Sequence, residues 1–211
     1  MNSNINRRKV NRCTTGFTLV EMSLVLVAMG IIMSVGLPIT RVYVEHSKHS
    51  EDRIRIQEIK DVLVGYALTR GGFPVPGVGD ILPSTGIGAS GKNPYAMDVQ
   101  YYVHASLTET ATAQSFTTLC ENAVDILDGT IIDTDPAICN DVTDAYANCT
   151  NSTVMAFVVV SPGQNRVMEH ENSDADLEYE NPAKKPNNLN DYDDVVASFG
   201  LPALINECQS I

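Results

Sequence analysis

The stretch GFTLVE at residues 16–21 decides the fold, because it begins a long apolar segment and places one carboxylate near the start of that segment. The segment from Phe17 to Thr40 has 24 positions. As an α-helix it would span roughly 36 Å, enough to cross the hydrocarbon core of a bilayer. Glu21 is its only charged residue. Such a charge costs roughly 2.5–3.5 kcal/mol on insertion scales, so we expect Glu21 to have a function and a cationic partner.

Residues 1–16 form a short leader with four basic residues and no acidic one (Arg7, Arg8, Lys9 and Arg12). Cleavage after Gly16 would create an amine on Phe17, close in sequence to Glu21. A basic leader, a glycine, Phe-Thr-Leu-Val-Glu and a long apolar helix together resemble the type IV prepilin family, which includes the pseudopilins of type II secretion systems.

The resemblance implies roles for four residues. A membrane peptidase would cut after Gly16 and methylate the new N-terminus at Phe17, and Glu21 would pair with the N-terminus of a neighbouring subunit. Pro38 lies where many such pilins carry a proline, and it is expected to kink or locally melt the helix. The implied partners are the prepilin peptidase and methyltransferase, other pilin or pseudopilin subunits and an inner-membrane assembly platform.

Two other interpretations of the N-terminus remain open. An ordinary secretory signal also has a basic region, an apolar region and a small-residue cleavage site, which Ala28-Met29-Gly30 loosely resembles. The chain would then be a secreted binding or adhesion domain that starts near Ile31. A plain single-pass anchor explains neither the junction at Gly16 and Phe17 nor Glu21.

The charge distribution indicates export. The chain from Phe17 onward has 10 Lys and Arg against 26 Asp and Glu, a formal charge of −16. With the basic leader retained inside, we expect a single pass through the bacterial inner membrane with the rest of the chain outside the cytoplasm, followed by a filament in the periplasm or at the cell surface. No nucleic-acid binding is expected, because such binding requires basic residues that neutralise phosphates.

The cysteines agree with an oxidising compartment. Cys13 lies in the leader, and four cysteines follow it (Cys120, Cys139, Cys149 and Cys208). They allow three pairings, among which the sequence does not choose. Our preferred pairing joins Cys120 to Cys139 and Cys149 to Cys208, and the second bond would tie the C-terminus to the body.

The expected organisation is a leader at 1–16, a transmembrane or filament-core helix at 17–40, an amphipathic continuation at 41–72 and a head at 73–211. Apolar residues recur at helical spacing from Ile56 to Tyr66, and Gly71-Gly72 ends the helix. The charged residues of the continuation are expected on a solvated face (Glu51, Asp52, Arg53, Arg55, Glu58, Lys60 and Asp61).

The head is expected to be α+β with a small antiparallel sheet, a pilin-like arrangement. Strands are predicted at 99–103, 154–160 and 195–199, a short helix at 115–127, turns at 128–153 and an apolar tail at 201–205. The second of these strands is a continuous apolar run, typical of a buried strand. Ser161 follows it in S-P-G rather than G-x-S-x-G, and His170 has no evident orienting partner, so we expect no enzyme activity.

A second, looser resemblance to minor pilins and pseudopilins lies in Val160-Ser161-Pro162-Gly163 followed by a polar loop and Asp193-Asp194 before an apolar strand. The loop is rich in carboxylates, and calcium takes six to eight oxygen ligands (candidates Asp174, Asp176, Asp191, Asp193 and Asp194). A solvated acidic surface is the alternative, because the EF-hand order is absent. No cofactor is required by either interpretation.

Overall fold

The computed structural model describes residues 18–83, 85–109, 115–132, 136–140, 152–168, 172, 177–181 and 193–210, without the side chains at 35–38, 178 and 180. Its elements follow one another along the chain as α1 (Leu19–Arg70), β1 (Gln100–Val103), the 3-10 helix η1 (Ala105–Leu107), α2 (Phe116–Leu127), β2 (Ala137–Cys139), β3 (Ser152–Ser161), β4 (Glu178–Glu180), β5 (Val195–Gly200) and α3 (Leu201–Gln209). The chain divides into two compact units, Met1–Val44 and Glu45–Ile211. The second is called the head unit below.

Helix α1 has 52 residues and belongs to both units. It ends at Arg70, directly before the Gly71-Gly72 pair that the sequence analysis expects at its end, because Gly71 takes the left-handed conformation with φ 79° and its amide donates to the Ala67 carbonyl at 2.8 Å. By length and composition α1 can cross a membrane. The predicted long apolar N-terminal helix is therefore present.

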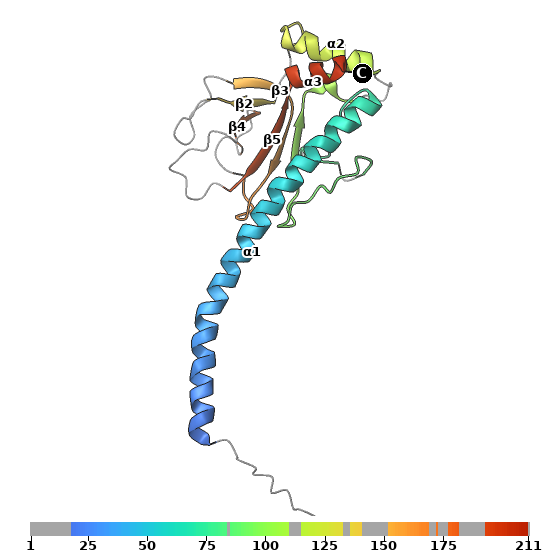
Figure 1. Cartoon of the computed structure of the whole chain (residues 1–211). Helices are drawn as coiled ribbons and strands as arrows, with labels where there is room; N and C mark the ends of the chain where they lie inside the picture. The colour runs from blue at the N-terminus through green and yellow to red at the C-terminus, as the bar shows by residue number, and fades with distance from the viewer. Residues whose placement is uncertain are drawn as a thin grey trace, which may run out of the picture. The chain divides into compact units, whose positions relative to one another are not determined.

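The sheet of the head unit is built around β3, the strongest predicted strand (Figure 1). The second half of β3 pairs antiparallel with β1 and β5, and its first residues pair antiparallel with β2. Strand β4 joins β2 in parallel, so the sheet is antiparallel apart from this one pairing among the described strands. The small sheet agrees with the expected α+β class.

Strand β3 is apolar throughout its second half because both faces of the sheet are covered. Phe157 and Val159 point into the main core with the buried stripe of α1, whereas Val158 and Val160 point into a second cluster with Ile138 and Tyr179. Aromatic rings fill the centre of the main core: the Phe157 ring centroid lies 5.0 Å from that of Phe73, 6.2 Å from that of Tyr101 and 5.7 Å from that of Phe199.

Helices α2 and α3 lie side by side and cover the end of the sheet that is nearest to the C-terminal end of α1 (Figure 1). Ser115 caps α2, and its hydroxyl accepts from the Thr118 amide at 3.2 Å. Buried leucines join the two helices to the main core (Leu119, Leu201 and Leu204). Helix α3 replaces the apolar tail that the sequence predicts at 201–205.

A disulfide joins α2 to α3 through Cys120 and Cys208, whose Cα atoms are 5.9 Å apart. The preferred pairing of Cys120 with Cys139 and of Cys149 with Cys208 is therefore wrong. The prediction failed because α2 packs against α3, and this packing brings together two cysteines that are 88 positions apart in the sequence. Cys139, at the end of β2, is also disulfide-bonded, and Cys149 lies outside the described residues. The C-terminus is tied to the body as expected, but by a different bond.

Candidate functional site

The first turn of α1 holds Glu21 in a capping box. Thr18 precedes the helix, and its backbone amide and hydroxyl donate to Glu21 Oε2 at 2.8 and 3.0 Å. In return the Glu21 amide donates to Thr18 Oγ1 at 3.3 Å. This reciprocal arrangement satisfies amides at the start of a helix, where a carboxylate is also favoured by the helix dipole. The signal T-x-x-E before an apolar run was present in the sequence, but the sequence reasoning missed it.

The first half of α1 exposes large apolar side chains on all sides. Residues such as Leu19, Leu26 and Ile32 are exposed by 87, 69 and 71%. A soluble helix keeps such residues for a buried face, so this segment fits an apolar environment. Gly16 and Phe17 lie outside the described residues. Helix α1 continues through position 38, and a kink at Pro38 remains a prediction.

The second half of α1 carries a buried carboxylate that the sequence analysis placed on the solvated face. Asp52 is fully buried, and the expectation of a solvated Asp52 is wrong. The physical reason is its position one turn before Ile56 on the buried stripe that continues to Ile59 and Leu63. The sequence signal was this helical spacing, which the neighbouring charged residues obscured.

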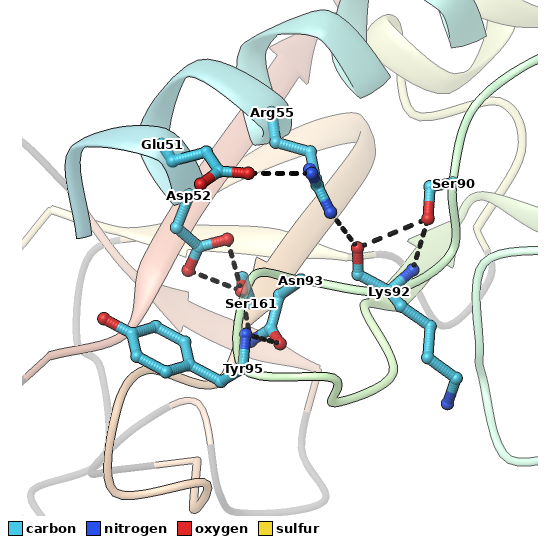
Figure 2. Close-up of polar contacts among 8 residues, drawn as sticks. All are labelled: Glu51, Asp52, Arg55, Ser90, Lys92, Asn93, Tyr95 and Ser161. Atoms are coloured by element: carbon cyan, nitrogen blue, oxygen red, sulfur yellow. Dashed lines mark hydrogen bonds and ion pairs between the residues drawn. The ribbon is translucent and has the colours of Figure 1, made fainter. Parts of the chain in front are cut away.

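Asp52 belongs to a polar cluster, the Asp52 cluster, with Ser161 at the end of β3 and Asn93 in the loop before β1 (Figure 2). The Ser161 hydroxyl lies 3.0 Å from Asp52 Oδ1 and 2.8 Å from Oδ2. Asn93 Nδ2 donates to Ser161 Oγ at 3.1 Å and to the Pro162 carbonyl at 2.6 Å, while Asn93 Oδ1 accepts from the Tyr95 and Met97 amides. The cluster therefore joins three segments that are distant in sequence.

Arg55, the cationic neighbour of Asp52 one turn along α1, donates hydrogen bonds to other groups. Arg55 donates to Glu51 Oε1 and to the Lys92 carbonyl, each at 2.9 Å (Figure 2). Burial is the main cause that raises the pKa of Asp52 to about 6, and the nearby carboxylates of Asp193 and Glu51 also raise it. The Ser161 hydrogen bond and the positive charge of Arg55 lower it. Ser161 thus binds a buried carboxylate on α1, and its bonds to Asp52 and Asn93 give it a structural role.

Asp193 and Asp194 hold the loop that follows β3. Asp194 accepts from the Gly163 amide at 3.3 Å and from Asn172 Nδ2 at 3.0 Å, and Asp193 accepts from the Asn165 amide at 3.0 Å. A Cβ atom at Gly163 would collide with Asp193, so the close approach requires glycine. These contacts hold the Ser-x-Gly segment and the Asp-Asp segment side by side.

The structure describes two of the five candidate calcium ligands, Asp193 and Asp194. Asp174, Asp176 and Asp191 lie outside the described residues, and Asp193 and Asp194 use carboxylate oxygens for the hydrogen bonds above. Within the described part of the chain, no group of three or more His, Cys, Asp or Glu residues could hold a metal ion. Calcium binding by the acidic loop remains a prediction.

Comparison of the chain with known proteins found no similar protein. No protein-family profile, no curated protein and no solved structure matches the chain.

Proposed function

We propose that the chain is a non-enzymatic structural subunit of a type IV filament, either a minor pilin of a pilus or a pseudopilin of a type II secretion system. The observation that carries the proposal is α1, whose first half is exposed and apolar apart from Glu21 and whose second half packs into the core of the head unit. One helix thus offers an apolar surface for a membrane or for other helices and also anchors a folded head. The prepilin resemblance of residues 16–21 supports the same role.

In this proposal the unprocessed chain is held in the inner membrane by α1, with the head unit outside the cytoplasm. The peptidase cuts after Gly16, and the amine of Phe17 becomes available to a carboxylate. An unpaired charge inside a bundle of apolar helices is costly, so assembly would favour the register in which Glu21 meets the N-terminus of a neighbour. The capping box keeps this carboxylate hydrogen-bonded within its own subunit until then.

Cleavage is tested by replacing Gly16 with valine, because a pocket that reads the residue before the cut can reject a larger side chain. Gly16→Val should accumulate as unprocessed protein in the native host. Gly30→Val is the matched control, since Gly30 lies within α1 and a Cβ there meets no atom within 4 Å. The N-terminus of the wild-type protein should be methylated Phe17. A start near Ile31 would instead support the secreted-domain interpretation.

The role of Glu21 is tested by separating its charge from its capping function. Glutamine is accepted at this position of a capping box, but it carries no charge. If Glu21 pairs with an amine, Glu21→Gln and Glu21→Ala should both insert into the membrane and both be depleted from sheared filaments. Thr18→Ala, which weakens the cap and keeps the carboxylate, should be depleted much less. Wild-type recovery of Glu21→Gln together with loss of Thr18→Ala would assign Glu21 to capping alone and contradict the pairing role.

A further inference from the structure

The Asp52 cluster contains an imbalance between donors and acceptors. Both carboxylate oxygens of Asp52 lie within hydrogen-bonding distance of one hydroxyl, that of Ser161. A serine hydroxyl has a single proton, so it can donate to only one of these oxygens at a time. Its acceptor capacity is already used in part by Asn93 Nδ2. Among the residues that the structure describes, the buried ionised carboxylate therefore receives one hydrogen bond from a side chain, fewer than its two oxygens can accept.

Protonation removes this imbalance. A protonated Asp52 can donate to Ser161 Oγ from one oxygen while the Ser161 hydroxyl donates to the other, which forms a closed pair of hydrogen bonds. The Ser161 oxygen then accepts from Asp52 and from Asn93 and donates once, which is its full capacity. The geometry consequently fits the neutral carboxyl better than the charged one.

We propose that Asp52 is a protonation-controlled latch that fastens the first turns of α1 in the head unit to the end of β3 and to the loop containing Asn93. The latch is closed when the carboxyl is neutral and loosened when it is charged. The three segments that it joins are distant in sequence, and its state changes how firmly the part of α1 around Asp52 is held by β3 and the Asn93 loop, while the buried stripe from Ile56 onward keeps α1 in the core. The inference does not depend on the proposed filament role.

The electrostatic surroundings agree with this assignment. On α1 itself Asp52 has Glu51 and Arg55 beside it, and Arg55 is shared with Glu51 and the Lys92 carbonyl. From the other elements it faces Asp193 and Tyr95. Lys48, which lies on α1 like Asp52, has its Nζ atom 5.5 Å from the centroid of the Tyr95 ring. Burial is the main reason that the pKa of Asp52 rises from 3.8 to about 6. Asp52 is therefore neutral in mildly acidic solution and charged at neutral pH.

The sign of the pH effect follows from linkage. Between the unfolded value near 3.8 and the folded value near 6, the folded state binds more protons than the unfolded state. The stabilisation is fully present at low pH and is lost as the pH rises through the folded pKa. The equilibrium constant for opening the latch should increase on the order of fiftyfold between pH 4 and pH 7.

Hydrogen exchange of the full chain in detergent micelles measures this opening. Exchange is followed by mass spectrometry from pH 4 to pH 7.5 in buffers with EDTA, and the rates are corrected for the intrinsic pH dependence. In the wild type, protection of segments 45–56 and 90–97 should fall with a midpoint near pH 6. Asp52→Asn should remove this transition. Asp61→Asn, at an exposed carboxylate on the same helix, should keep it.

A second variant keeps the test decisive if Asp52→Asn does not fold. Arg55 lowers the pKa of Asp52, so Arg55→Gln should move the midpoint to higher pH. A purely structural role of Arg55 would lower protection at every pH without moving the midpoint. The proposal is overturned by the absence of a transition in the wild type, by its persistence in Asp52→Asn, or by an unchanged midpoint in Arg55→Gln.

Discussion

The bond between Cys120 and Cys208 should contribute several kcal/mol to the stability of the head unit. It closes a loop of 88 positions, for which the chain-entropy relation gives about 4.6 kcal/mol as an upper value, and measured disulfides typically contribute about 2–4 kcal/mol. The head unit has roughly 170 residues, and its unfolding entropy near the melting temperature is about 0.35 kcal/mol/K. Loss of the bond should therefore lower the melting temperature by roughly 6–11 °C.

The assay compares thermal and urea unfolding of residues 45–211 with those of the variant Cys120→Ala, Cys208→Ala, both produced in an oxidising compartment and followed by circular dichroism. Addition of a reductant is the control, because it opens the bond in the wild type and should remove most of the difference. The urea slope of the variant should be unchanged or slightly larger, since its unfolded chain is more expanded. A difference below about 1 kcal/mol between the oxidised proteins would refute the reasoning.

Four other substitutions test the packing of the head unit, each measured by urea unfolding. Gly72→Ala should destabilise the head unit by about 1–3 kcal/mol, because the new Cβ would lie 2.8 Å from the Glu109 amide nitrogen. Gly65→Ala should stabilise the head unit by about 0.5–1 kcal/mol, because Gly65 lies in the middle of a helix and a Cβ there meets no atom within 4 Å. Effects of the same sign for both variants would contradict this reasoning. Phe157→Ala should cost about 3–5 kcal/mol by emptying the centre of the aromatic cluster, and a cost below 2 kcal/mol would indicate that the core collapses around the gap. Tyr66→Phe should cost about 1 kcal/mol through loss of the hydrogen bond to Glu109, and an unchanged midpoint would show that solvent replaces it.

Much of the fold could be predicted because its signals are local. The long apolar segment, the stripe from Ile56 to Tyr66 and the Gly-Gly end define α1, and the apolar run from Val154 to Val160 defines β3. Strands β2 and β4 have three residues each, and pairing with their neighbours, rather than a pattern of their own, makes them strands. Helix α3 is not predicted from the sequence because its two start signals are weak: Gly200 provides no capping side chain, and Pro202 commonly indicates the end of a helix. In the structure Pro202 lies in the first turn of α3, where a proline is tolerated.

The candidate sites likewise include one whose signal is local in the sequence and others whose partners are distant. The capping partner of Glu21 is three residues away and could have been read from the sequence. Ser161, which binds Asp52, is 109 positions away, and Asn93, which binds Ser161, is 41 positions from Asp52, so only the folded chain shows that this carboxylate is buried. The disulfide pairing is equally non-local, because it depends on how α2 packs against α3.

The bond between α2 and α3 has a consequence for the order of folding. Ribosomes make the chain from its N-terminus, so Cys120 becomes available long before Cys208, and Cys139, only 19 positions later, is the first cysteine made after it. Closing the shorter loop is favoured by about 1.4 kcal/mol of chain entropy, roughly tenfold in the equilibrium constant. The first bond open to the growing chain is thus a non-native one, and the native bond forms only after α3 has been made. Maturation in an oxidising compartment should therefore depend on a disulfide isomerase.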